Sequence, residues 1–515
     1  MRIGTNVAAI VANNALQKSQ NNLSTSIERL SSGYKINGSK DDAAGCAISE
    51  KMRAQIRGLS QAQNNTADGV SVLNTAEGAI TEIQSMLTRL KELSVQAAND
   101  VNSDDEREAI QKEIEQINNE IDRISDQTEF NTQSLINGNL SRRVYSDLQG
   151  VNQLSVSDSY TAGVYGITVT EDARQAIAVG AGSITMSSTA SITEEQAGAI
   201  NINGYKISIS EGDTLDKVMG KIIDGVNITG GSAFTVKDLN NDTVANGTDY
   251  AGYVPTVDYA GSTLVIMTNQ YGSDQKMNIT CDNAELADIL GIPQAATQDG
   301  IYVEGSDVKA EIATGDDGKR IGFADSAILS TKGTVITVTD VNNKEFSMDV
   351  PGNAAGTVFD DSNNDGQSAA GAGTARTISQ EVTDVGTMSI HVGANQDQVI
   401  VIDIPAITTY SLGTEHMNVM TQYTASRAIS TVDEAINKTN KIRSRIGAYE
   451  NRFDHTTNNL EVSSENLTKS LSTMIDTDMS EEMTTYTSET VLTQAATSIL
   501  AQANERPSQV LQLLQ

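Results

Sequence analysis

Both ends of the chain carry apolar residues at alternating steps of three and four, the spacing of a single helix face. The N-terminal run is Leu73, Ala76, Ile80, Ile83, Leu87 and Leu90. The C-terminal run is Ile442, Ile446, Tyr449, Phe453, Leu460, Leu467 and Met474. This spacing is typical of helices that pack in coiled coils. Neither end offers an obvious partner for its own apolar face, so we expect the two ends to pack on each other as an antiparallel bundle.

Two further helices are predicted near the chain ends. The first carries Ile110, Ile114, Ile117, Ile121 and Ile124. Ser103 followed by Glu106 forms a capping-box pattern that marks its start. The second is the final segment, with Leu492, Ala496 and Ile499 on one face. Pro507 is expected to kink or end that helix.

The middle of the chain has the character of β-structure. It is rich in Gly, Thr, Ser and Asn, and it alternates apolar with polar residues. Asn203-Gly204 separates two such runs and predicts a hairpin. Further strands are expected at 262–267, 333–341 and 398–404, with short helices at Leu215–Ile223 and Ala284–Leu290. The predicted fold class is therefore α+β and multidomain: a long antiparallel coiled-coil or helical bundle built from both chain ends, with an inserted β-rich outer block.

These patterns predict three regions. Residues 1–43 and 472–515 form a terminal helical coiled-coil domain. Residues 44–140 and 387–471 form a helical core domain with a β-hairpin. Residues 141–386 form a β-rich surface insert of two subdomains, one of which includes 196–293.

Composition excludes several classes of function. The formal net charge of −32 argues against nucleic-acid binding, which needs a basic surface. No run approaches the roughly 20 apolar residues of a membrane span, and the first residues lack the apolar segment of a secretory signal peptide. By composition alone the protein would be cytosolic. The only two cysteines, Cys46 and Cys281, form no disulfide framework.

Long segments at both ends resemble the bacterial flagellins. They include MRIGTNVAAIVANNALQKSQNNLSTSIERLSSGYKINGSKDDAAGCAISEKMRAQIRGLSQAQNN at the start, LTRLKELSVQAAND at 87–100 and EIEQINNEIDRISDQTEFN at 113–131. They also include STVDEAINKTNKIRSRIGAYENRFDHTTNNL at 430–460 and TSILAQANERPSQVLQLLQ at the end. The resemblance covers roughly 1–140 and 387–515. Cys46 stands where the family usually has Gln, which leaves the local hydrogen bonding there open.

The resemblance implies a structural subunit that polymerises into the flagellar filament used for swimming. It also implies that the terminal helical domain (1–43 and 472–515) forms an inner tube of the filament and the helical core domain (44–140 and 387–471) an outer tube. It implies an extracellular protein, secreted without a cleaved signal peptide, which replaces the cytosolic interpretation. Its partners would be further copies of itself, a flagellin export chaperone, the export apparatus, and the filament cap and junction proteins. The chain ends would fold only on assembly, through helices that contain Ile3, Val7, Ile10, Leu23, Ile27, Leu30, Leu492 and Ile499.

Two binding surfaces also follow from the resemblance. The export chaperone would bind the tail residues Ile499, Leu500, Val510, Leu513 and Leu514. Host Toll-like receptor 5 would bind the monomer at Arg89, Lys91, Glu92, Leu93, Gln96 and Glu113. Arg89 and Leu93 fall off the apolar seam, so both are expected to face solvent. Lys91 stands where the family usually has Arg, which weakens a bidentate contact.

No catalytic site is predicted. His391, His416 and His455 do not form the H-E-x-x-H pattern that some flagellin inserts use to hold a metallopeptidase zinc. The pattern Asp361, Asn363, Asp365 lacks the Glu of a calcium loop, and we interpret it as a polar turn. We therefore predict no enzyme and no cofactor. The alternatives are a hook–filament junction protein, which shares weaker versions of both ends, and a surface adhesin.

Overall fold

A computed structural model describes residues 6–513, apart from 158–159, 181, 238–260, 293–299, 316–317, 341–343, 353, 355–358, 361–368, 371–374 and 384. The side chains of 236–237, 359–360, 369–370 and 506–513 are likewise outside the description. The chain divides into two compact units. The first contains residues 1–70, 390–400 and 451–515, and the second contains 71–389 and 401–450.

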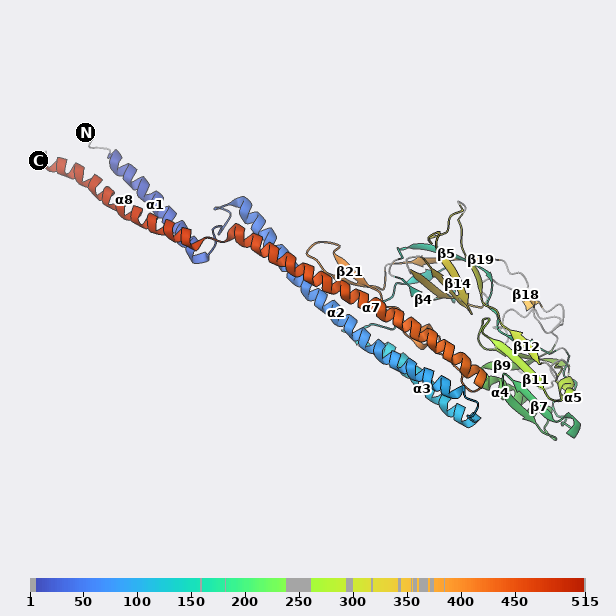
Figure 1. The fold of residues 1–515 in the computed structure, drawn as a ribbon. Coiled ribbons are helices and arrows are strands. Elements are labelled where there is room, and N and C mark those ends of the chain that lie inside the picture. Colours follow the sequence, from blue (N-terminus) through green and yellow to red (C-terminus); the bar gives the residue numbers. More distant parts are fainter. Residues whose placement is uncertain are drawn as a thin grey trace. The chain divides into compact units, whose positions relative to one another are not determined.

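The first unit pairs the two ends of the chain (Figure 1). Helix α1 (Val7–Ser32) lies antiparallel to α8 (Met479–Leu513). Asn6 Nδ2 donates to the carbonyl of Ala503 at 2.9 Å near one end of the pair. Near the other end, Arg29 lies 3.6 Å from Glu482. The predicted packing of the two chain ends on each other is therefore confirmed.

The two paired helices, α1 and α8, are interrupted at the same level. Helix α1 ends at Gly33, whose φ of 77° is left-handed and favours glycine. Helix α2 (Ala43–Ala97) follows it, and α7 (Gln422–Ile475) precedes α8. Tyr34 and Asp476 form a β-bridge between the two links. In the same unit, Leu59 of α2 packs against Leu460 of α7.

The helical part of the second unit packs α2 against α3 (Asp104–Gln127) and α7. The predicted seam of α2, from Leu73 to Leu90, is completely buried. Ser103 and Glu106 form the predicted capping box at the start of α3. The predicted seam of α3 is confirmed in part, because Ile110, Ile114 and Ile121 are buried. Its other two positions, Ile117 and Ile124, are only half-buried.

The first part of the β-block contains two antiparallel sheets and two helices around one apolar core. One sheet has the order β6 (Ile177–Val179), β10 (Ser262–Thr268), β9 (Gly231–Lys237). The other has the order β12 (Ile301–Glu304), β11 (Lys276–Cys281), β7 (Gly198–Ile202), β8 (Tyr205–Ile209). The helices are α4 (Leu215–Ile228) and α5 (Ala284–Ile289).

The predicted hairpin joins β7 to β8. Asn203 has a φ of 49° and Gly204 a φ of 89°, the left-handed pair that a tight hairpin turn requires. The strand predicted at 262–267 and both short helices are also confirmed, although α4 extends five residues further, from Ile223 to Ile228.

The second part of the β-block consists of two four-stranded antiparallel sheets. The first has the order β13 (Lys309–Ile312), β5 (Gly163–Glu171), β19 (Arg376–Val382), β3 (Val144–Ser146). The second has the order β14 (Ile328–Lys332), β15 (Val335–Thr339), β16 (Glu345–Asp349), β4 (Asn152–Val156). Between them lies an aromatic cluster of Tyr160, Tyr165, Phe323 and Phe346, with ring centroids 5.1–6.1 Å apart.

The remaining elements are short. They are β1 (Glu129–Phe130) with β2 (Gln133–Ser134), β17 (Phe359–Asp360) with β18 (Ala369–Ala370), β20 (Met388–His391) with β21 (Val399–Ile402), the 3-10 helix η1 (Glu194–Gln196), and α6 (Thr409–Leu412). Together the elements confirm the predicted α+β class, with helices from both chain ends and a β-rich insert.

Of the two outcomes expected at Pro507, a kink or the end of the helix, the second is wrong. Helix α8 does not end at Pro507 but continues to Leu513. A proline removes one backbone donor and crowds the preceding turn, yet a helix can continue past it when its other hydrogen bonds remain.

Candidate functional site

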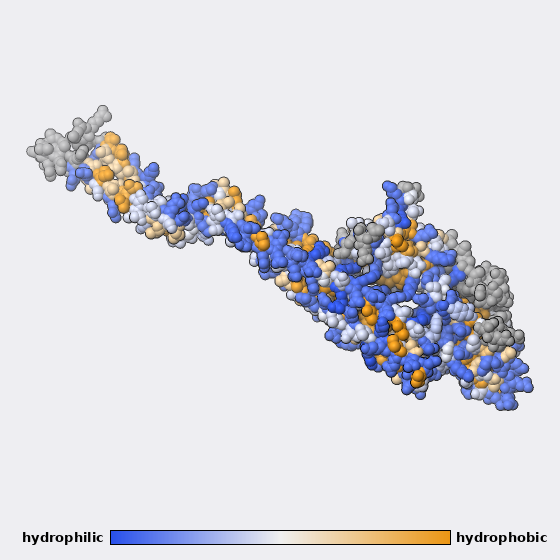
Figure 2. All heavy atoms as spheres, in the orientation of Figure 1, coloured by the Kyte–Doolittle hydropathy of each residue, from blue (hydrophilic) through white to orange (hydrophobic). Residues whose placement is uncertain are grey.

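The terminal helices α1 and α8 carry apolar side chains that one chain does not bury. Val7 is 65% exposed, Ile10 51% and Val11 62%. On α8, Leu492 is 50% exposed and Ile499 is 57% exposed. Figure 2 shows hydrophobic residues gathered on the surface of these helices. Large apolar side chains exposed together indicate a surface made for contact with another molecule.

The predicted assembly residues fall on this surface to different degrees. Val7, Ile10, Leu492 and Ile499 lie on it, together with Ile27, which is 49% exposed. Leu23 and Leu30 are half-buried. Ile3 lies outside the described residues. The structure therefore places most of the predicted set on the exposed faces of one helix pair.

An apolar groove runs between the two helices. It has a volume of about 590 Å³ and is lined by Val7, Ala8, Val11, Ala12, Ala15, Ala496 and Ile499. Among the residues of α1, only Ala12 and Ser26 are buried. Helix α1 therefore contacts α8 mainly through small side chains, and the larger apolar groups stay uncovered.

Some residues of this surface were missed by the sequence analysis. Val11 follows Val7 by four residues, a spacing that would have placed it on the same helix face. Met483 and Val491 on α8 are 48% and 59% exposed. They line a second hollow of about 520 Å³ that also includes Leu492. The sequence analysis did not identify these positions because polar residues interrupt the apolar periodicity of α8.

The predicted chaperone residues lie at the end of α8. Ile499 is exposed and Leu500 is half-buried. Val510 and Leu513 belong to the helix, but their side chains are outside the described part of the structure, and Leu514 lies outside it altogether.

The patch around Arg89 is built from α2 and α3 in the second unit. The Arg89 guanidinium donates to Glu113 Oε1 at 2.8 Å and to Glu92 Oε2 at 3.1 Å. These hydrogen bonds raise the pKa of Arg89, first through Glu113 and then through Glu92. The Arg89 side chain is 49% exposed, as predicted. Gln96 is also exposed.

The expectation that Leu93 faces solvent is wrong, because Leu93 is only 1% exposed. The reason is that α2 has two helical partners at this level. Arg89 contacts α3 through Glu113, while Lys91 Nζ lies 2.5 Å from Asp433 of α7. A helix covered on two sides buries a wider stripe than the seam of a two-helix coiled coil.

In the part of the chain that the structure describes, no three His, Cys, Asp or Glu side chains gather in a way that could hold a metal ion. No helix among the described residues is long and apolar enough to cross a membrane. Cys46 and Cys281 are both free. The calcium-loop pattern at Asp361 lies outside the described residues.

Comparisons with known proteins match both helical ends. The model of the bacterial flagellin N-terminal helical region matches residues 3–141, and that of the C-terminal helical region matches 429–514. The flagellin of Salmonella typhimurium is 31% identical, with 99% of each chain covered. Polar flagellin A of Vibrio parahaemolyticus is 30% identical, with 100% of this chain and 99% of that one covered.

Among solved structures, FliC from Burkholderia pseudomallei is similar at 14% identity and a TM-score of 0.22, covering 75% of this chain and 99% of its own. The sequence relatives extend over both helical ends and the insert between them. The chain belongs to the bacterial flagellin family and is a structural subunit of the flagellar filament.

Proposed function

We propose that the filament assembles by burying the exposed apolar faces of α1 and α8 against neighbouring subunits. The observation that carries this proposal is that α1 leaves Val7, Ile10 and Val11 more than half exposed in a single chain. Burying a large aliphatic side chain stabilises a contact by about 1.5–3 kcal/mol. Several such side chains from each subunit supply a strong driving force for association.

The same proposal covers the arrangement of the three regions. Residues 1–43 and 472–515 form the inner layer of the filament wall. Residues 44–140 and 387–471 form the layer around it, and 141–386 face outward. The interruption at Gly33 and Asp476 supports a boundary between the first two regions, because both paired helices stop there.

Deletion of residues 493–515 tests the role of α8. We expect the shortened chain to form no filaments in electron micrographs. Its β-block should keep the circular dichroism spectrum and the unfolding temperature that it has in the full-length chain. Filaments of ordinary length from this chain would contradict the proposal. Short oligomers from the full-length chain, in place of long filaments, would favour a junction protein.

A point variant with a matched control is sharper. Val11→Ser with Leu492→Ser removes two exposed apolar groups, and Asn13→Ser with Gln494→Ser changes two exposed polar groups on the same helices. We expect the apolar pair of changes to raise the critical concentration for assembly by about tenfold or more. The polar pair should leave it unchanged.

We further propose that the protein is secreted and that an export chaperone covers the end of α8 beforehand. Ile499 supports this idea, because it is 57% exposed and would promote early self-association. Binding coupled to folding of this tail should show a large negative heat-capacity change. The chaperone should bind the full-length chain but not a chain that ends at residue 490. Equal binding of both chains would refute the proposal.

Recognition of the monomer by Toll-like receptor 5 is proposed for the exposed part of the Arg89 patch. Arg89, Glu92, Gln96 and Glu113 are exposed, so they supply the polar contacts. Leu93 supports the helix from inside the bundle. An exposed Arg is a frequent hot spot in protein interfaces.

The receptor proposal is tested by titrating the monomer against the receptor ectodomain. Arg89→Ala should lose about 2 kcal/mol of binding, the usual size of a hot-spot effect. The control is Arg123→Ala. It removes an arginine that is also exposed and paired with a carboxylate, but that lies on α3. Equal affinity of the two variants would contradict the proposal.

A further inference from the structure

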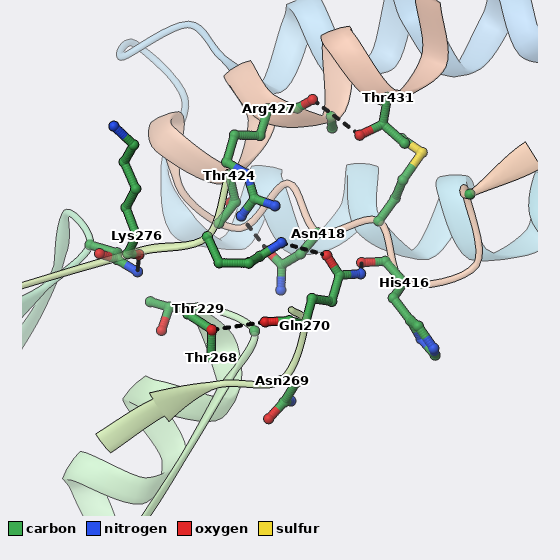
Figure 3. Close-up of a pocket in the computed structure, with 16 residues that line it drawn as sticks. Thr229, Thr268, Asn269, Gln270, Lys276, His416, Asn418, Thr424, Arg427 and Thr431 are labelled. Atoms are coloured by element: carbon green, nitrogen blue, oxygen red, sulfur yellow. Dashed lines mark hydrogen bonds between the residues drawn. The ribbon is translucent and has the colours of Figure 1, made fainter. Parts of the chain in front are cut away.

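A polar cavity of about 350 Å³ lies in the second unit, between strands β10 and β11 and the beginning of α7. Figure 3 shows the side chains that surround it. Its volume is at the small end of the range for ligand pockets, which is roughly 300–1,000 Å³. A ligand of this site is therefore about the size of one sugar ring.

Arg427 of α7 contributes a positive charge to this cavity. Within the described part of the chain, no acceptor or carboxylate engages its guanidinium, and its carbonyl oxygen accepts from the hydroxyls of Ser430 and Thr431. Figure 3 shows the side chain extending from α7 toward Gln270. A guanidinium presents five N–H donors in a planar fork that fits a carboxylate with two parallel hydrogen bonds.

The second cation of the cavity wall, Lys276, is already neutralised. Its Nζ lies 2.7 Å from Glu304 Oε1 and 5.4 Å from the ring centre of Tyr302. Figure 3 shows this side chain directed away from the group around Arg427 and Gln270. The site thus holds one uncompensated positive charge, which matches a ligand with one negative charge.

A side-chain amide supplies an unused acceptor beside this charge. Gln275 is only 6% exposed. Its Nε2 donates to Gln270 Oε1 at 3.1 Å, and among the described residues its own Oε1 accepts no hydrogen bond. An amide oxygen can accept from a hydroxyl, so this wall favours a ligand that carries hydroxyl groups.

We propose that the cavity binds a monosaccharide carboxylate of the uronic-acid class. Its carboxylate lies against the Arg427 guanidinium, and one of its hydroxyls donates to Gln275 Oε1. A phosphate would bring a second negative charge that the site does not neutralise, in a protein whose net charge is already −32. A neutral sugar would leave the guanidinium without a partner.

Calorimetric titration of the full-length monomer with glucuronate tests the proposal. We expect a dissociation constant in the millimolar range or tighter, as for a small ligand with one charged contact. Arg427→Gln should weaken binding by about tenfold or more. Gln275→Met, which keeps the volume and removes the amide, should weaken it by a smaller factor. The matched control Arg123→Gln should bind as the unaltered protein does, and circular dichroism verifies that each variant is folded.

Three comparison ligands and one variant can overturn the proposal. Glucose binding as tightly as glucuronate would show that the charge is irrelevant. Acetate binding as tightly would show that the hydroxyls are irrelevant, and inorganic phosphate binding more tightly would show that the ligand class is wrong. Unchanged glucuronate binding in Arg427→Gln, or no binding by the unaltered monomer, would remove the site altogether.

Discussion

Helices α1 and α2 follow one another in the chain, yet they bury very different surfaces. In α2, six consecutive seam positions from Leu73 to Leu90 are fully buried. In α1, Ile10 is 51% exposed and Val7 is 65% exposed. Both helices show the apolar spacing of a packed face. The difference lies in the number of partners that each finds within its own chain.

Within the second unit, α2 packs against α3 and α7 together, so its apolar face is covered from two sides. Among the described residues, helix α1 packs mainly against α8, and α8 presents small residues such as Ala496 to it. A helix whose apolar face stays in water gains little from folding, because burial is what offsets the loss of chain entropy. The comparison therefore separates a region that is stable alone from one that needs other subunits.

The largest effect should come from a cavity in α2. Leu87→Ala removes a side chain that is 0% exposed. We expect a loss of about 3 kcal/mol in the free energy of unfolding, in the usual range for such changes. Urea unfolding of the monomer measures it. Glu82→Ala, an exposed change on the same helix, serves as the control, and equal losses in both would mean that this seam is not the core.

The β-block extends the comparison, because it has a core of its own and an ion-pair cluster around Asp213 that depends on pH. Hydrogen bonds from Lys217 at 2.7 Å and Lys221 at 2.6 Å hold the pKa of Asp213 well below its usual range. A depressed folded-state pKa stabilises the fold fully above the unfolded-state value of about 3.9, and this contribution is lost as the pH falls below it.

Asp213→Asn should therefore lower the stability of the β-block by about 1–2 kcal/mol at pH 7, and should make it less dependent on pH below about 4. Acid titrations followed by near-ultraviolet circular dichroism measure both effects. Asp224→Asn changes an exposed carboxylate of α4, the helix that begins just after Asp213, and should behave as the unaltered protein does. Parallel acid curves for Asp213→Asn and the unaltered chain would rule out this role.

A smaller effect is expected at the start of α3. Ser103→Ala removes one half of the capping box, in which the Ser103 hydroxyl accepts from the backbone N–H of Glu106. The usual cost of losing such a cap is about 1 kcal/mol. Ser85→Ala, an exposed serine within α2, is the control in the same unfolding experiment. No difference between the two variants would show that packing alone defines this end of α3.

The smallest effect on the monomer should come from α1 itself. Ile10→Ala changes a side chain that is already half exposed, so the free energy of unfolding should shift by less than about 0.5 kcal/mol. Its critical concentration for assembly should nevertheless rise, whereas that of the control Asn13→Ala should not. A loss of several kcal/mol in the monomer would break the distinction drawn between α1 and α2.

Several features were predictable from local sequence. Asn203-Gly204 marked its hairpin because few residue pairs accept two left-handed conformations. Ser103 and Glu106 marked the start of α3 because their side chains satisfy each other's backbone donors. The seam of α2 was predictable because one helix face repeats every few residues.

Other features were not predictable in this way. The burial of Leu93 depends on α3 and α7 covering α2 at the same level, and no spacing within α2 carries that information. The cavity beside Arg427 joins residues of β10 and β11 to residues of α7 that lie more than a hundred positions further along the chain. Periodicity describes one element at a time, whereas these features arise between elements.

The sequence by itself determined the helices at both ends, some of the strands between them, where several of these elements begin, and which family the chain resembles. These properties depend on neighbouring residues, since turns, caps and helix faces are satisfied within a few positions. Only the tertiary structure decided how much of each apolar face is covered. That quantity depends on how many helices meet at one level, which is why α2 is buried within the chain and α1 is left to be covered by other subunits.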